Sequence, residues 1–147
     1  KLYAIDISNL KEISSAFVPT QLPGLPKCAS QMIGFRGHPI PVLDLRILNG
    51  DSSPQNPPQQ IVSKFGDLPC ALWVDEVLNV RRAHKMDKAS GIVKNSSTGS
   101  LASIVGDIIW DGKEAVALIS DYRVEKLLKY VKEKTESLDD CDKKQAA

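Results

Sequence analysis

Cysteine and histidine, the residue types that most often carry chemistry, do not form a site in this sequence. Cys28, Cys70 and Cys141 stand far apart without a CxxC pair, and His38 and His84 have no second ligand at metal-binding spacing. Cys28 and Cys70 fall in or beside apolar stretches, where a buried thiol is more common than a nucleophile. The sequence therefore predicts no catalytic residue, no metal and no cofactor. An enzyme that uses Cys28 or Cys70 is the third-ranked hypothesis.

Recognised catalytic motifs are also missing. The sequence has no Gly-rich phosphate loop, no GxSxG elbow and no HExxH pair. Asp75 and Glu76 are adjacent carboxylates, but neighbours in a strand point to opposite faces and would not share a proton. The motifs therefore favour a binding protein over an enzyme.

One basic run could contact phosphate, and it consists of Arg81, Arg82, His84, Lys85 and Lys88. A small barrel that binds nucleic acid through residues 81–88 is therefore the alternative function. A solvated loop is favoured over it, because the net charge is only +1 and aromatic residues, which would stack on bases, make up 5%.

The composition describes one ordinary domain of 147 residues, with 42% hydrophobic and 25% charged residues. No apolar run approaches the roughly 20 residues that span a bilayer, so membrane insertion is not expected. An odd number of widely spaced cysteines argues against a disulfide framework and predicts a reducing, cytoplasmic location.

The elements that would position any site are mostly short strands. Residues 3–7 alternate in the period of a half-buried strand, and residues 13–18 could continue as a second one. Three hairpins are predicted, because apolar runs flank Arg36-Gly37, Phe65-Gly66-Asp67 and Asp111-Gly112. A strand extension over 77–80 and a brief helical turn over 45–48 are also expected. Residues 81–100 are polar and mixed, and are predicted to be mainly loop.

The C-terminal region changes period. Val124, Leu127, Leu128 and Val131 mark one helix face, so a helix is predicted over 121–131. Residues 132–147 are charged and poor in apolar residues, which predicts a frayed or disordered tail. Residues 49–60 form a polar, Pro-rich connector that could join lobes 1–50 and 59–120.

The stretch from Gly34 to Arg46, GFRGHPIPVLDLR, resembles the signature of the CheW-like domain. That signature has an Arg-Gly turn followed by a Pro-Val-hydrophobic-Asp-Leu-Arg run. Residues 3–13, 72–80 and 104–128 resemble other segments of the family, in order and at compatible spacing. The resemblance covers about residues 2–130 and identifies residues 1–131 as one CheW-like domain.

The resemblance implies an all-β fold of two packed, five-stranded, SH3-like barrels with a C-terminal helix. The family's usual opening strand has no counterpart before Tyr3, so we expect an open sheet edge in the first barrel. A non-catalytic adaptor is implied, which couples the cytoplasmic tips of chemoreceptors to a CheA-type histidine kinase. Such an adaptor is cytoplasmic and associates with membrane receptor arrays.

Carried over by motif position, Arg36, Leu10 and Glu12 are the expected receptor-binding residues. An internal ion pair of Arg36 with Glu12 or Asp44 is the competing interpretation for Arg36, and Leu10 could equally be plain core. Structural roles are expected for the remaining motif residues, Gly37, Pro41, Asp44 and Arg46.

Two departures from the family pattern concern glycines. Gln31 and Ala71 stand where the family usually has glycine. The resemblance implies that receptor tips dock in a groove between the lobes. Both positions are expected to border this groove, so their side chains would narrow or reshape it and alter the choice of partner.

Overall fold

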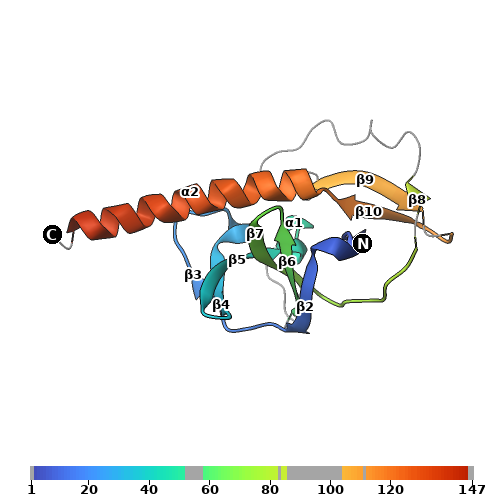
Figure 1. The fold of residues 1–147 in the computed structure, drawn as a ribbon, viewed down its shortest axis with the longest axis horizontal. Coiled ribbons are helices and arrows are strands. Elements are labelled where there is room, and N and C mark those ends of the chain that lie inside the picture. Colours follow the sequence, from blue (N-terminus) through green and yellow to red (C-terminus); the bar gives the residue numbers. More distant parts are fainter. Residues whose placement is uncertain (1, 52–57, 83, 86–103, 111, 146–147) are drawn as a thin grey trace.

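The computed structural model of this chain describes residues 2–51, 58–82, 84–85, 104–110 and 112–145. These residues form two β-sheets and one long C-terminal helix (Figure 1). The predicted mostly-β class with a terminal helix is confirmed. Two barrels of five strands each were expected, whereas the described residues form one sheet of six strands and one of four. Neither strand order closes into a ring.

The larger sheet contains the hairpin that carries the family signature, residues 34–46. Its strand order is β2-β6-β7-β5-β4-β3, and β5 pairs with β7 in parallel. In chain order the strands are β2 (Leu10–Ser15), β3 (Thr20–Gln21), β4 (Gln31–Phe35), β5 (His38–Asp44), β6 (Gln59–Phe65) and β7 (Leu68–Val74). The hairpins β4–β5 and β6–β7 confirm the predicted turns at Arg36-Gly37 and Gly66-Asp67.

The smaller sheet joins the two ends of the sequence. Its order is β1-β10-β9-β8, and β1 lies parallel to β10. The strands are β1 (Tyr3–Ala4), β8 (His84–Lys85), β9 (Val105–Trp110) and β10 (Ala115–Ile119). The β9–β10 hairpin was predicted, although Asp111 of its turn lies outside the described residues.

The division into lobes differs from the prediction. The connector 49–60 leads from β5 and the short helix α1 (Leu45–Leu48) into β6, and β5 and β6 both belong to the larger sheet. The smaller sheet instead takes β1 from the N-terminal segment and β8–β10 from the C-terminal half. β1 is one of its two outer strands among the described residues, so the sheet edge next to Tyr3 belongs to the smaller sheet. Sequence order misled the division because β1 pairs with a strand more than a hundred residues away.

Three predicted strands differ in extent. The second, predicted over 13–18, is β2 and covers Leu10–Ser15. The first ends at Ala4, because the Asp6 carboxylate accepts bonds from Ser8 N and Ser8 Oγ and begins a 3₁₀ turn, η1 (Ile7–Asn9). Val77–Val80 form no strand, and the backbone N–H of Val77 instead donates to the Gln59 side chain. Leu78 and Val80 are exposed.

The terminal helix α2 (Asp121–Gln145) is longer than the predicted span 121–131. Ser120 caps its start, since Ser120 Oγ accepts from Arg123 N and the Ser120 carbonyl accepts from Val124 N. Lys, Glu and Gln are good helix formers even without an apolar face, and Glu125 pairs with Lys129 one turn on. The charged sequence after residue 131 is therefore helical up to Gln145.

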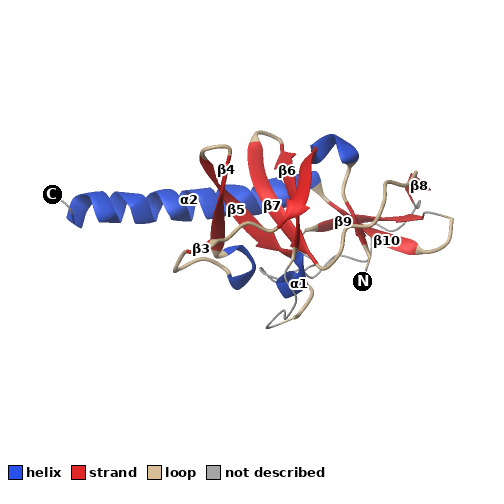
Figure 2. Cartoon of the chain, turned by 90° about the horizontal axis from the view of Figure 1, so that it is seen from below, coloured by secondary structure: helices blue, strands red, loops and turns tan. Residues whose placement is uncertain are grey.

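The core has two parts, one on each face of the larger sheet. The first lies between this sheet, α2 and the smaller sheet, and contains Leu43, Phe65, Leu72, Ile119 and Leu128. The second lies on the opposite face and contains Ile33, Ile40, Val42, Val62, Ala71 and Trp73. Figure 2 shows α2 passing behind β4 to β7 and extending beyond them.

Candidate functional site

A groove of about 730 Å³ separates the two sheets. We call it the intersheet groove. One wall comes from the larger sheet, with Leu10, Ile61 and Leu72, and the other from the smaller sheet, with Val116 and Leu118. Most of the lining is apolar, so the groove suits a partner that buries apolar side chains.

Two extended segments border this groove. Residues 2–7 and residues 75–81 both line it along their full length. Both cross between the sheets, since residues 2–7 lead from β1 toward β2 and residues 75–81 lead from β7 toward β8. Sequence analysis missed these segments as groove borders, because the apolar residues of 77–80 were assigned to a strand.

Side-chain hydrogen bonds join the parts of the chain around this groove. Tyr3 Oη of β1 donates to Asn49 Oδ1 at the end of α1 over 2.8 Å. Burial raises the pKa of the Tyr3 hydroxyl, so it stays protonated and able to donate near neutral pH. Asn9 Nδ2 donates to Asp121 Oδ1, also over 2.8 Å. No sequence motif marks these four residues.

Of the three expected receptor-binding residues, Leu10 is the one that lines the intersheet groove. It is the first residue of β2 and is partly buried. Glu12 follows on the same strand but does not line the groove, since the β2–β6 register shifts between Leu10 and Glu12.

Arg36 lies in the β4–β5 turn, outside the groove. It has a φ of 50° and Gly37 a φ of 81°, the two positive values of a tight hairpin turn. Its side chain is 76% exposed, stacks 5.0 Å from the Phe35 ring and reaches Glu12 at 3.6 Å. Arg36 and Glu12 therefore form the ion pair that one interpretation expected, and they lie next to the groove that Leu10 lines, because Glu12 is two residues from Leu10 on β2.

Asp44 and Arg46 form a buried pair at the start of α1. Asp44 Oδ1 accepts from Arg46 N at 3.0 Å and from Arg46 Nε at 3.1 Å, and Asp44 Oδ2 accepts from Arg46 Nη2 at 3.0 Å. Both side chains are less than a tenth exposed. The pair caps α1 and fixes the end of β5. Arg46 also lines the intersheet groove.

The two glycine departures do not shape this groove. Gln31 begins β4, and its Nε2 donates to Gln21 Oε1 of β3. Ala71 is fully buried in β7 between Val42 and Val62, on the face away from α2. Neither lines the groove, so the structure does not support the expected narrowing.

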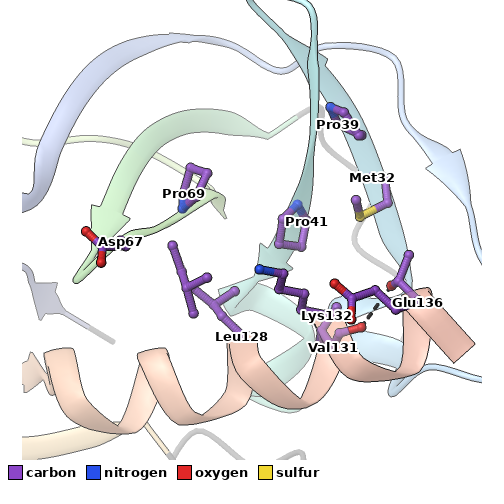
Figure 3. A pocket seen from close by; sticks show the side chains of 11 residues that line it. Met32, Pro39, Pro41, Asp67, Pro69, Leu128, Val131, Lys132 and Glu136 are labelled. Carbon is purple, nitrogen blue, oxygen red and sulfur yellow. Dashed lines mark hydrogen bonds between the residues drawn. The ribbon is translucent and has the colours of Figure 1, made fainter.

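A second, smaller cavity of about 250 Å³ lies between α2 and the two hairpins of the larger sheet (Figure 3). Pro41, the remaining motif residue, lines it together with Met32, Pro39 and Pro69. Leu128 and Val131 of α2 close its other side. Pro41 therefore lies on the side of the larger sheet that faces α2.

The structure describes the side chains of two cysteines and one histidine, Cys28, Cys70 and His38. Cys28 and Cys70 are free and buried, and burial raises the pKa of both thiols, with Asp44 adding to the effect at Cys28. His38 is exposed at the start of β5. The described part of the chain holds no cluster of three His, Cys, Asp or Glu residues that could bind a metal.

The structure describes the basic run only in part. Arg81 Nε donates to Asn79 Oδ1, and Arg82 is exposed. His84 and Lys85 form β8, so they are not loop as predicted, and Lys88 lies outside the described residues. Within the residues that are placed, no helix is long and apolar enough to cross a membrane.

These features define a two-sheet β protein with an apolar groove between the sheets. A family model described as the CheW-like domain matches residues 1–131, and the chain belongs to that family.

The chain is also similar in fold to the scaffolding protein TtCheW from Thermoanaerobacter tengcongensis. The TM-score is 0.62 at 23% sequence identity, and the match covers 80% of each chain. The comparison with curated proteins gave no match.

Proposed function

We propose that this chain is a non-catalytic adaptor that couples chemoreceptors to a CheA-type histidine kinase, in the cytoplasm beside the receptor arrays. The family match over residues 1–131 is the observation that carries the proposal. TtCheW, which has a similar fold, is a scaffolding protein, and this agrees with an adaptor role. The buried thiols and the lack of a metal cluster among the described residues are compatible with this role.

The intersheet groove is the proposed binding site of the receptor tip. Its walls belong to different sheets, so an inserted partner touches both at once. Leu10, Ile61 and Leu118 supply apolar contact, and burial of such area contributes roughly 25 cal/mol per Å².

Arg36 is the proposed polar contact beside the groove. An exposed ion pair such as Arg36–Glu12, at 3.6 Å, contributes about 0–1 kcal/mol, so a partner carboxylate can replace Glu12 at little cost. A non-glycine residue at positive φ is strained, and such strain is often found at functional positions. The turn fixes the backbone beneath the guanidinium and limits where it can reach.

Binding to a receptor cytoplasmic fragment and to the kinase regulatory domain tests the proposal. We expect the wild type to bind both. Arg36→Glu should weaken receptor binding by about tenfold or more, since hydrogen bonds to charged groups contribute about 1.5–3 kcal/mol. Its stability should change by no more than about 1 kcal/mol, as at most exposed sites.

Arg82→Glu is the control for charge reversal, because Arg82 is also an exposed arginine but lies outside the β4–β5 turn that carries Arg36. It should bind like the wild type. If the wild type binds neither partner, the proposed function is wrong. If Arg36→Glu unfolds the protein, Arg36 is internal bracing instead of a contact.

A further inference from the structure

We propose that Asn9 and Asp121 are positioning residues whose hydrogen bond fixes the two walls of the intersheet groove relative to each other. The proposal deepens the proposed function, since it concerns how the receptor site is held open. The bond joins residues 112 positions apart in the sequence.

The bond connects two places where the chain passes from one sheet to the other. Asn9 ends η1, which carries the chain from β1 of the smaller sheet to β2 of the larger sheet. Asp121 begins α2, directly after β10 of the smaller sheet, and α2 packs against the core of the larger sheet. The Asn9–Asp121 bond therefore ties two independent crossings together.

Groove residues stand on both sides of the bond. Ile7 and Leu10 flank Asn9, and Leu118 and Ile119 precede Asp121 by two or three residues. A shift between Asn9 and Asp121 would thus be passed directly to the apolar walls. The exposed Tyr3–Asn49 bond is a second link across the groove, from β1 to the end of α1, and it involves neither η1 nor α2.

The chemistry favours a persistent bond. Asn9 is 9% exposed, Asp121 is exposed, and the Asp121 carboxylate accepts from the Asn9 amide at 2.8 Å, the length of a charge-assisted hydrogen bond. Water has little access to the Asn9 amide, so losing Asp121 would leave a buried donor without that partner. Asp121 also lies in the first turn of α2, where the helix dipole favours a negative charge.

A pair of spin labels measures the position of the walls. The labels replace exposed residues of the two sheets, Lys11→Cys on β2 and Ala115→Cys on β10. Cys141→Ser removes one other thiol, and Cys28 and Cys70 are buried. The distance distribution between the labels, from double electron–electron resonance, then reports the relation of the two sheets.

Four variants distinguish a positioning role from general stability. Asn9→Asp places a second carboxylate against that of Asp121, so it should shift or broaden the distance distribution. Asn9→Ala removes the bond without adding a charge and should also broaden the distribution. Asp121→Asn keeps an acceptor for Asn9 and should resemble the wild type. The exchange Asn9→Asp with Asp121→Asn restores a bond of reversed direction and should restore the wild-type distribution.

Trp73→Phe is the control for stability alone. It removes the buried bond from Trp73 Nε1 to Gln60 Oε1 within the larger sheet, and should lower the melting temperature without moving the labels. If Asn9→Asp and Asn9→Ala leave the distribution unchanged, or the exchange fails to restore it, the inference is wrong.

Binding of the receptor fragment to the same variants tests the functional consequence separately. Asn9→Asp and Asn9→Ala should bind about three- to tenfold more weakly than the wild type, the range expected for one hydrogen bond, and the exchange should recover the affinity. If the wild type does not bind the fragment, the proposed function fails, while the label distances still decide the inference about the walls.

Discussion

Replacing Arg46 by methionine tests how much the buried Asp44–Arg46 ion pair contributes to the free energy of unfolding. The substitution keeps most of the aliphatic stem and removes the guanidinium. It leaves the Asp44 carboxylate, which is about 95% shielded from solvent, with the backbone N–H of residue 46 but without the two bonds from the guanidinium.

The expected cost is about 3–5 kcal/mol, the usual loss when one partner of a buried pair is removed. With an m-value of about 1.5 kcal/mol/M, this lowers the urea midpoint by about 2 to 3 M. The double variant Asp44→Asn with Arg46→Met removes both charges and should recover at least part of the loss.

Arg36→Met is the matched control, since the same change is made at a side chain that is 76% exposed. It should cost no more than about 1 kcal/mol, because an exposed ion pair contributes little. Equilibrium urea unfolding measures all of the variants. Equal small losses for Arg46→Met and Arg36→Met would refute the reasoning from burial.

Three further outcomes are expected. Gly66→Ala should destabilise by about 1–2 kcal/mol in thermal unfolding, because Gly66 has a φ of 61° and an added Cβ would lie 2.9 Å from the Glu125 carboxyl group. Gly24→Ala meets no atom within 4 Å at a φ of 81°, so a larger loss there would contradict this explanation. In a Cys141→Ser background, iodoacetamide at pH 8 should modify Cys28 and Cys70 slowly until urea unfolds the protein, since burial raises both thiol pKa values; rapid labelling of the folded chain would revive the enzyme hypothesis. The chain should not shift a labelled oligonucleotide, whereas a salt-dependent shift would favour the nucleic-acid alternative.

Local sequence signals predicted local structure well. The Arg36-Gly37 and Gly66-Asp67 turns produced the hairpins expected of them, and Asp44 capped α1. These features depend on the conformations open to glycine and on one carboxylate close in sequence, both of which are visible in a short window.

Long-range pairing could not be predicted in the same way. Nothing in residues 3–7 indicates that β1 lies beside β10, and nothing in Asn9 indicates a bond to Asp121. Gln60 likewise was assigned to a polar connector, yet it is fully buried and accepts a bond from the Trp73 indole. Such contacts depend on which surfaces the assembled sheets bring together.

The residues expected at the candidate site lie in different places in the structure. Leu10 is at the groove, but Glu12 and Arg36 lie outside it, and Ala71 is buried in the opposite part of the core. A motif shows only which stretch of the chain a residue belongs to. The face of the sheet that the residue occupies depends on the alternation of side chains along the strand and, in β2, on the shift of the β2–β6 register.

The pairing of β1 with β10 also constrains how the molecule is made. A ribosome releases β1 early, but its partner emerges only after residues 115–119 have been synthesised. The larger sheet can form while translation continues, since its strands lie between residues 10 and 74, but the intersheet groove cannot form until residues 115–119 have been synthesised. A nascent chain therefore lacks this groove until both of its walls are present.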